Sequence, residues 1–475
     1  MASSSTSFTS NAHKALADAE LQRALQNVKR GFILKRETAV EKLPEFDQLR
    51  AEARAIKDHT LGHLDLYLEA YEEKVNESGG KVHYASTAAE ARDTVLALCR
   101  AEKAKRVTKG KSMVSEEIGL NAHLEAAGIE VVETDLGEYV LQIRGEPPSH
   151  IIAPIVHLNK EAIEADFRRA HRTLPSARKL KSVADLVAEA RAVLREKFIT
   201  ADIGITGANL LIAETGSSVI LTNEGNGDLT STLPRVHIVI ASIEKVVPTL
   251  EDASTILRLL ARSATGQDMA TYTSFATGPR RDDDPDGPSA YHVVLLDNGR
   301  SEMLGSVFQD MLRCIRCGAC LNHCPVYGAI GGRAYGSVYP GPMGAVLTPA
   351  LQGIEHASDL PNASSFCGRC EEVCPMSIPL PKMMRAWRER DFADRGPPLR
   401  QRITLKVWAY TAKRPLLYHA LAGAIMPLLA WRAGRRGRFS RLPFGKSWTR
   451  TRDFPAPEGN TFHRLYAKAK RSSSS

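Results

Sequence analysis

The sequence lacks the segments that direct a protein through or into a membrane. The N-terminus, MASSSTSFTSNAHKALADAE, has no charged start followed by an apolar core, so we expect a disordered lead-in and no secretory signal. The longest apolar stretch, Pro415 to Trp431, is interrupted by His419 and Pro427 and is shorter than the roughly 20 residues of a spanning helix. These absences predict a cytoplasmic protein without a transmembrane helix, at most peripheral at the inner face of the membrane.

Fingerprints of common catalytic sites are also missing. Neither GxxxxGK[ST] nor GxGxxG occurs, and the stretch 215–228, TGSSVILTNEGNGD, fits turns at Gly225 and Gly227 better than a phosphate-binding loop. None of the 14 histidines belongs to HExxH or to an evident Ser/His/Asp set, and we expect His157 and His237 to be structural. The chain therefore shows no flavin fingerprint and no hydride-transfer site.

Acidic residues are scarce at one end of the chain. From Lys382 to the C-terminus there are 22 Lys and Arg against 5 Asp and Glu, although the net charge of the whole chain is only +9. This asymmetry suggests that the tail meets an acidic partner protein or an anionic membrane surface, with a merely solvated face as the alternative. We expect no specific nucleic acid as a partner.

The first 300 residues show alternating strand and helix patterns. A long amphipathic helix is expected over 45–77. Candidate strands are Val82–Ala85, Arg106–Thr108, Glu130–Thr134, Ile151–Ala153, Ala201–Ile205, Ser218–Thr222, Val236–Ala241 and Tyr291–Leu296. Candidate helices are Ala88–Lys103, Ser115–Ala127, Lys160–Arg169, Val183–Lys197 and Ser242–Leu260. This alternation indicates an α/β fold with a largely parallel sheet.

At 475 residues the chain is too long for one ordinary core, so we expect several domains. The predicted organisation is a flexible lead-in over 1–44, an α/β domain over 45–299, a mostly helical ferredoxin-type domain over 300–385 and a basic, helical or irregular extension over 386–475. A helix over 301–313, SEMLGSVFQDMLR, should lead into the cysteines. Asp202, Asn209, Glu214 and Glu224 could meet at the carboxyl ends of strands, where α/β folds bind ligands.

Seven of the eight cysteines lie in two spaced motifs. The first, Cys314-x-x-Cys317-x-x-Cys320-x-x-x-Cys324-Pro325, is the bacterial ferredoxin run, and the second, Cys367-x-x-Cys370-x-x-x-Cys374-Pro375, lacks its first cysteine and has Ser364 there. In the usual crossed arrangement, [4Fe–4S] cluster one takes Cys314, Cys317, Cys320 and Cys374, and [4Fe–4S] cluster two takes Cys324, Cys367 and Cys370. Cluster two is thus one thiolate short. Its fourth position should be exchangeable and open to water, a partner residue or a substrate oxygen.

Disulfides and zinc sites are the other common uses of cysteine. Disulfides are disfavoured by the reducing compartment expected for a chain without an export signal. Zinc sites also use CxxC pairs, but the third and fourth cysteines of the first run and both Cys-Pro endings favour iron–sulfur clusters. Cys99 lies on a predicted amphipathic helix away from the motifs and should be a buried core thiol.

Four segments resemble the lactate-utilisation iron–sulfur proteins of the LutB (YkgF) family. They are TGANLLIAETGSSVILTNEGNGD, MLRCIRCGACLNHCPVY, YGSVYPGPMGAVLTP and FCGRCEEVCPMSIPLPKMM. The resemblance implies an N-terminal lactate-utilisation (LUD) domain, similar in fold to sugar-isomerase and coenzyme A transferase sheets, and a ferredoxin-type domain. It also implies a role beside companion subunits in oxidising L-lactate to pyruvate in bacteria. The shortened second motif matches the family pattern.

Three functions follow as hypotheses. The leading one is a non-catalytic electron-transfer subunit of a lactate-oxidising complex, with an electron acceptor of unknown identity. In the second, the three-cysteine cluster binds a substrate directly and the chain is a catalytic subunit. In the third, the α/β domain senses a metabolite and the clusters are structural.

Overall fold

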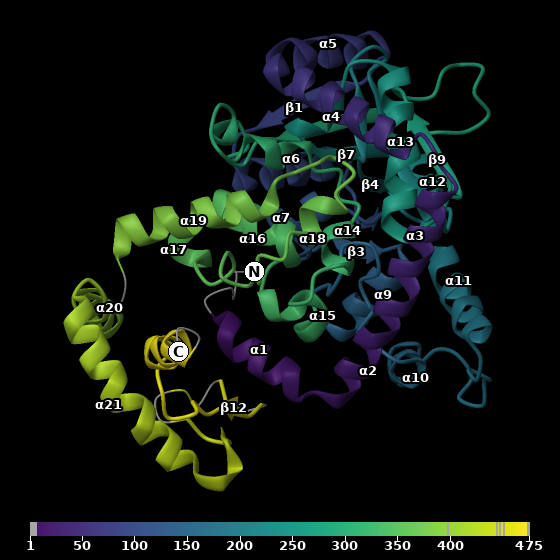
Figure 1. The fold of residues 1–475 in the computed structure, drawn as a ribbon. Helices are drawn as coiled ribbons and strands as arrows, with labels where there is room; N and C mark the ends of the chain where they lie inside the picture. The colour runs from purple at the N-terminus through teal and green to yellow at the C-terminus, as the bar shows by residue number, and fades with distance from the viewer. Residues whose placement is uncertain (1–6, 397–398, 443–444, 446–447, 450–451, 473–475) are drawn as a thin grey trace. The chain divides into compact units, whose positions relative to one another are not determined.

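The computed structural model describes residues 7–396, 399–442, 445, 448–449 and 452–472, and it divides into two compact units (Figure 1). The first unit is Met1–Asp391 and the second is Phe392–Ser475. The cysteine segment packs against the α/β segment within the first unit, because the two share one hydrophobic core that includes Val219 and Ile256. The α/β and ferredoxin-type parts therefore form one packed body.

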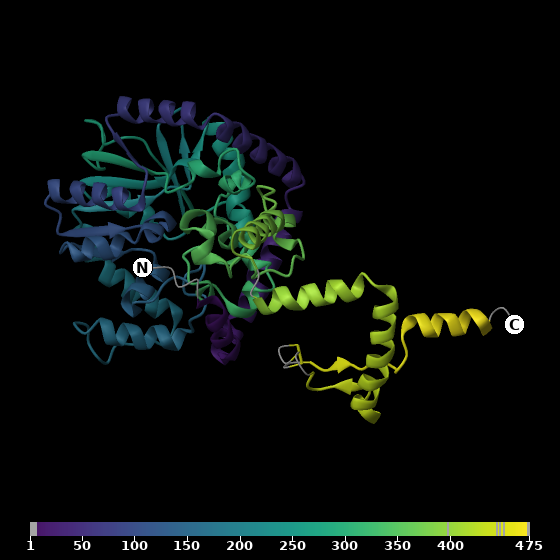
Figure 2. The same cartoon turned by 90° about the vertical axis from the view of Figure 1, so that its left-hand side faces the viewer.

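The first unit is built around a six-stranded sheet in the order β1-β10-β7-β4-β2-β3. All of its pairings are parallel. The strands are β1 Lys81–Ala85, β10 Ala290–Leu296, β7 Val236–Ser242, β4 Ile203–Gly207, β2 Arg106–Lys109 and β3 Glu130–Glu133. The predicted parallel α/β sheet is confirmed, and Figure 2 shows helices on both sides of it.

Alternate side chains of the central strands enter two different cores. Ile238 and Ile240 of β7 pack with helices α6 (Ala88–Ala101), α7 (Met113–Ile118) and α8 (Leu120–Ala126). Val239 and Ala241 pack with α5 (Leu64–Glu77) on the other face. Because successive side chains of a strand point to opposite faces, a sheet covered on both sides needs such a continuous apolar run.

A second sheet, in the order β8-β5-β6-β9, was only partly anticipated from the sequence. Its strands are β5 Leu210–Ile212, β6 Ser217–Thr222, β8 Val246–Val247 and β9 Tyr272–Ala276. The expected α-helix from Ser242 is wrong over its first residues: Ser242 ends β7, Ile243–Lys245 form a 3₁₀ turn (η3), and Val246–Val247 form β8. Helix α13 (Leu250–Thr265) starts later because Thr249 and Asp252 form a capping box at its first turn.

Other expected elements are broken or absent. The long N-terminal helix is two helices, α4 (Phe46–Gly62) and α5, with a break at His63. No strand forms at 151–153, because the ring Nδ1 of His150 accepts the backbone N–H groups of Ile152 and Ala153 at 3.0 and 3.1 Å and turns the chain. Glycines interrupt two expected helices: Gly119 (φ +67°) separates α7 from α8, and Gly305 (φ +69°) lies between two 3₁₀ turns, η4 (Ser301–Met303) and η5 (Gln309–Arg313). The remaining long helices of this unit are α9 Leu136–Arg144, α10 Lys160–Ala170, α11 Val183–Ile199 and α12 Asn226–Thr232.

The segment expected to be a flexible lead-in is helical from residue 8 onward, and residues 1–6 lie outside the described residues. It forms α1 (Phe8–Ala17), α2 (Ala19–Val28), the π-turn η2 (Lys29–Ile33) and α3 (Leu34–Glu41). Gln22 donates a hydrogen bond of 2.8 Å to the carbonyl of Ala329, and the rings of Phe8 and Tyr335 lie 5.4 Å apart. These contacts with the cysteine segment order residues whose polar sequence suggested a lead-in.

The cysteine segment consists of short helices joined by tight turns. They are α14 Ala319–Asn322, α15 Tyr327–Ile330, η6 Arg333–Tyr335, α16 Gly341–Gln352, α17 Ile354–Ala357 and α18 Arg369–Glu372, followed by α19 Leu380–Arg395. Many of their apolar side chains, such as Met383 and Trp387 of α19, are buried. Trp387 stacks on Phe308 with ring centroids 4.1 Å apart and donates a hydrogen bond of 3.0 Å to the carbonyl of Val346.

The second unit is mostly helical and nearly without a core. It contains α20 (Leu399–Ala412), α21 (Pro415–Ala433), η7 (Gly434–Arg436), a two-residue pairing of β11 (Arg438–Phe439) with β12 (Phe454–Pro455), and α22 (Phe462–Ser472). Among its described residues, only Phe439 and Thr449 are buried. Pro427 does not end α21, and the continuous helical stretch Pro415–Arg436 is long and apolar enough to cross a membrane by length and composition, with a mean hydropathy of 1.2. The expectation that this stretch is too short is therefore not supported.

Candidate functional site: two cavities lined by cysteine

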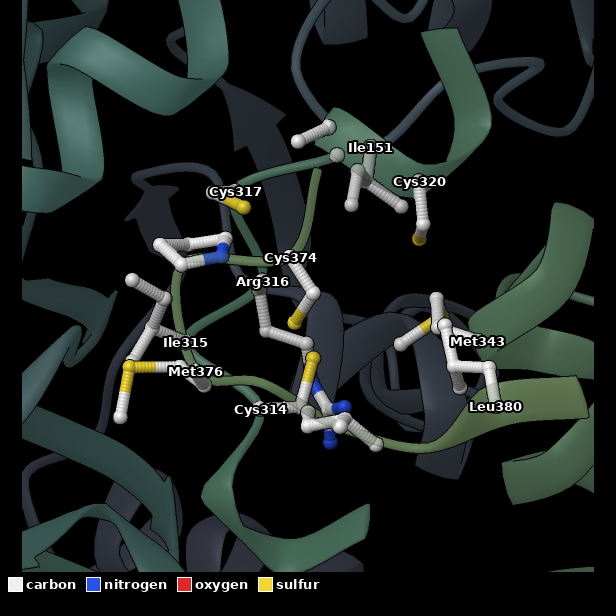
Figure 3. Close-up of a pocket in the computed structure, with 14 residues that line it drawn as sticks. Ile151, Cys314, Ile315, Arg316, Cys317, Cys320, Met343, Cys374, Met376 and Leu380 are labelled. Carbon is white, nitrogen blue, oxygen red and sulfur yellow. The ribbon is translucent and has the colours of Figure 1, made fainter. Parts of the chain in front are cut away.

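Four cysteines from both motifs line one cavity. Cys314, Cys317 and Cys320 come from the first motif and Cys374 from the second. Figure 3 shows their side chains around a shared space, with Met343 on one side and Met376 on the other. The free space around them, part of it open to solvent, is about 370 Å³. The rest of the lining is mainly apolar and comprises Ile151, Ile315, Arg316, Gly318, Ala319, Pro375, Ile378 and Leu380.

The other three motif cysteines line a second cavity. Cys324 of the first motif is there with Cys367 and Cys370 of the second, around about 290 Å³ of free space, part of it open to solvent. The remaining lining residues are His323, Pro325, Pro342, Ser364, Ser365, Gly368 and Pro381. Each cavity thus combines cysteines from both motifs, and Ser364 lies on the cavity that has three cysteines.

The two motifs fold as copies of one local structure. Gly318 and Gly368 lie fifty positions apart, between equivalent cysteines, and both have positive φ, +75° and +81°. Glycine adopts this left-handed conformation without the strain that a side chain would add. Each glycine is followed by a four-residue helix, α14 or α18, that carries the next cysteine, Cys320 or Cys370.

Burial makes the thiols poor acids when no positive group is bound. Desolvation raises the pKa of Cys317 and Cys370 to about 12 and that of Cys374 to about 11. Backbone N–H groups that donate hydrogen bonds to these sulfurs oppose the shift. Such groups become thiolates only when a strongly positive centre lies among them. Soft, buried sulfur donors around an apolar cavity are the donor set of an iron–sulfur cluster, so the residues fit that cofactor.

The cysteine sulfurs are spread around each cavity and do not converge on one point. Among the residues that the structure describes, no three His, Cys, Asp or Glu side chains converge closely enough to hold one metal ion. A tetrahedral zinc site would bring all its sulfur ligands to about 2.3 Å from one ion. A cluster of several irons instead takes one ligand at each iron, which matches cysteines spread around a cavity.

Two arginines of the N-terminal helices hold the second motif. Arg50 of α4 donates hydrogen bonds of 3.2 and 2.9 Å to the carbonyl oxygen of Cys374 and one of 3.1 Å to that of Glu372. Arg36 of α3 donates one of 2.9 Å to the carbonyl of Val373. Nothing in the sequence motif points to these residues, because they precede the cysteines by more than 300 positions.

A buried ionic network joins the α/β sheet to the first cavity. The guanidinium of Arg300 is fully buried and lies 2.6 Å from Glu117 of α7 and 3.1 Å from Glu244, which follows β7. Arg316, on the cavity wall, lies 3.2 Å from the same Glu244. Burial would raise the pKa of Glu244, but Arg300 and Arg316 hold it at about 2. Desolvation, followed by the charge of Arg316, lowers the pKa of Lys245 to about 8.

One of the four residues proposed for a pocket at the carboxyl ends of the strands lies at their other end. Asp202 precedes β4, and its carboxylate accepts the backbone N–H groups of Lys105 and Arg106 at the amino end of the strands. Asn209 accepts the N–H of Leu221, and Glu214 accepts that of Leu250. Each of these three is bound locally. Desolvation raises the pKa of the fourth, Glu224, with the charge of Asp135 adding to the shift.

The residues expected to be structural lie away from the cysteine cavities or pair with neighbouring side chains. Cys99 is fully buried in the core between α6 and the sheet, and its burial raises its pKa to about 12. His237 is buried in β7 with its ring 2.8 Å from the hydroxyl of Thr206. His157 lies 2.8 Å from the hydroxyl of Ser149 and 3.4 Å from Glu146.

Known proteins identify both parts of the first unit. The LUD domain family matches residues 68–296, and the 4Fe-4S dicluster domain family matches residues 310–378. A crystal structure of a DUF162 family protein from Deinococcus radiodurans is similar to 49% of this chain and 98% of its own, at 14% identity and a TM-score of 0.27. An α/β LUD domain joined to a 4Fe-4S dicluster domain defines an iron–sulfur protein.

Relatives similar over nearly the whole length narrow this class. The lactate utilization protein B of Anoxybacillus flavithermus is 42% identical over 458 residues, which cover 96% of both chains. Those of a Geobacillus species and of Bacillus pumilus are 44% and 41% identical, over 89% and 97% of each chain. The chain belongs to the lactate utilization protein B family, and the resemblance seen in the motifs is confirmed.

Proposed function

We propose that this chain is the electron-transfer subunit of a complex that oxidises L-lactate to pyruvate. The proposed ligands are Cys314, Cys317, Cys320 and Cys374 for cluster one, and Cys324, Cys367 and Cys370 for cluster two. The observation that carries the proposal is the sorting of seven cysteines into two cavities, each drawing on both motifs. Bound [4Fe–4S] clusters supply one-electron transfer.

The protein's own contribution is to bury, order and charge-balance these sites. The cysteines of the first cavity other than Cys314 are buried, which keeps water away from the sulfurs. Backbone N–H groups donate to the sulfurs, as Tyr327 does to Cys324 at 3.5 Å. Arg36 and Arg316 bring positive charge toward a site whose thiolates make it negative. Hydrogen bonds and charge at these positions set the driving force for electron transfer.

The second cavity is the one lined by an exposed cysteine. Cys367 is exposed, and the neighbouring Phe366 is 39% exposed with the guanidinium of Arg388 lying 4.2 Å from its ring centre. Electrons would pass between the buried first cluster and an external acceptor through the second. The hydride chemistry on lactate is assigned to companion subunits, because this sequence has no flavin fingerprint.

A catalytic role remains as the second function. With three cysteines on the second cavity, an open iron could act as a Lewis acid on a hydroxyl or carboxylate of a substrate. The distinction lies in turnover. We expect the purified, reconstituted chain to accept electrons without oxidising lactate in the presence of an artificial acceptor, and companion subunits to restore turnover. Robust lactate oxidation by the chain alone would reject the electron-transfer role and favour the catalytic one. Clusters that cannot be reduced would favour a sensing module.

We further propose that the second unit holds this cytoplasmic protein at an anionic membrane surface. Residues 396–452 contain 13 Lys and Arg and no Asp or Glu. Helix α21 has no buried residue and exposes apolar side chains around much of its circumference, including Leu416, Tyr418, Ile425 and Leu428. Basic residues at both ends, Arg414 and Arg432, suit both ends lying at one anionic leaflet.

A further inference from the structure

The second cavity holds a nitrogen donor as well as its three cysteines. His323 directly precedes Cys324 in the first motif and lies on the lining of that cavity. Its Nε2 is buried and has no hydrogen-bond partner. Most buried polar atoms in folded proteins have a partner, so an unpaired nitrogen at a site short of one ligand needs an explanation.

The hydrogen bond at the other ring nitrogen defines which tautomer is present. Nδ1 of His323 lies 2.9 Å from the carbonyl oxygen of Ala319. Because a carbonyl oxygen can only accept, Nδ1 carries the hydrogen, and the free lone pair of the neutral ring is on Nε2. Histidines that bind metals show this arrangement, donating the other N–H to a backbone carbonyl that fixes the ring.

The oxygen donors of the cavity fit a ligand role less well. The hydroxyl of Ser364, which stands in the position of a missing cysteine, accepts the backbone N–H of Phe366 at 3.1 Å. Ser365 is exposed. A serine hydroxyl is also a harder and much weaker acid than a thiol, whereas imidazole binds iron as a neutral ligand. Among the lining residues, His323 is the one whose donor atom is buried and unused.

We infer that His323 is the fourth protein ligand of the second [4Fe–4S] cluster, binding one iron through Nε2. The inference rests on the proposed function, which places that cluster between Cys324, Cys367 and Cys370. It replaces the open, exchangeable iron expected from the cysteine count. The iron that lacks a cysteine is then bound by a residue of the first motif, one that the cysteine spacing does not predict as a ligand.

A histidine ligand has a consequence for electron flow. Replacing a thiolate by a neutral imidazole removes one negative charge from the cluster, and clusters with histidine ligands have higher potentials than all-cysteine ones of the same type. The second cluster should therefore be reduced at a higher potential than the first. Electrons would run from the buried site toward the exposed one at Cys367.

The decisive experiment is pulsed EPR on the full chain, reconstituted anaerobically and then reduced. We expect hyperfine coupling to a coordinated nitrogen that changes when histidine is labelled with ¹⁵N. The coupling should vanish in His323→Ala and persist in His356→Ala, a change at an exposed histidine between the motifs. On mild oxidation the His323→Ala variant should lose iron from one cluster and give the EPR signal of a three-iron form, while the unaltered chain keeps its iron.

A second variant tests the same ligand without leaving the position empty. His323→Cys supplies a thiolate, so it should retain the iron, lose the nitrogen coupling and lower the potential of one cluster. An unaltered chain that holds both clusters but shows no histidine nitrogen coupling would overturn the ligand assignment alone, even if the variants fail to fold. The same holds if Ser364→Ala, rather than His323→Ala, makes the cluster labile. A chain that binds no cluster at all would overturn the proposed function instead.

Discussion

Cys324 and Cys374 are exchanged between the two cavities. Each ends its motif with a following proline, and each lies with the cysteines of the other motif. A cluster held in this way would connect chain segments that are fifty positions apart, so metal binding should stabilise the fold of the whole cysteine segment.

Replacing Cys317 by Ser should remove one cluster. About half of the iron and acid-labile sulfide should be lost, because Cys317 belongs to the cavity of cluster one. The segment 300–380 should also become sensitive to limited proteolysis, since the cluster ties the two motifs together. Cys99→Ala, which changes the cysteine in the α6 core, is the matched control and should keep its iron. Full iron content and unaltered melting of Cys317→Ser would disprove the ligand assignment.

Arg300→Gln should be strongly destabilising. The guanidinium is 0% exposed and pairs with Glu117 and Glu244. Glu244 would keep Arg316, but the carboxylate of Glu117 would lose its ion-pair partner. Breaking a buried pair from one side costs about 3–5 kcal/mol. We expect the free energy of unfolding to fall by that amount and the melting temperature to fall with it. Arg54→Gln breaks an exposed pair with Asp58 and should cost under about 1 kcal/mol. Similar melting of both variants would mean that the Arg300 network adds no stability.

Acid should destabilise the first unit through its buried histidines. Burial lowers the pKa of His237 to about 3 and that of His150 to about 4, below the value of roughly 6.5 in an unfolded chain. The unfolded chain therefore binds more protons between about pH 6.5 and pH 3–4, and stability falls as the pH falls through that window, by roughly 1 kcal/mol per pH unit and histidine. His237→Gln should flatten this dependence in urea unfolding at a series of pH values. His356→Gln, at an exposed site, should leave it unchanged, and equal slopes in both variants would reject this cause.

Charged residues placed in α21 should release the protein from membranes. Leu421→Glu combined with Ile425→Glu puts two carboxylates on an otherwise apolar helix, where they weaken its burial among lipids and are repelled by anionic headgroups. We expect at least tenfold weaker cosedimentation with vesicles containing phosphatidylglycerol. Leu66→Glu, on the exposed face of α5, is the control. The unaltered chain should bind vesicles of phosphatidylcholine alone much more weakly, because its basic flanks need anionic lipid. A chain that ignores anionic vesicles but binds a purified companion subunit through α21 would show that the helix docks on protein.

The sequence by itself determined the chemistry of the site and the main sheet. Cysteine spacing and the two Cys-Pro endings are local patterns, and they were enough to identify an iron–sulfur protein and to group the cysteines. The strands of the parallel sheet were visible because buried strands read as continuous apolar runs, as Val236–Ser242 does. Short strands such as Val246–Val247 carry too few residues for such a pattern.

Only the tertiary structure decided which polar groups near the cysteines are in use. Arg50 reaches the carbonyl of Cys374 from more than 300 positions away, and no local rule relates the two. His323 looks like any residue inside the CxxxC step until the fold shows that its Nδ1 is hydrogen-bonded and its Nε2 is buried without a partner. The spacing of ligands along a chain is a local property. Whether a donor atom is free depends on everything packed around it, and that is settled only when distant segments meet.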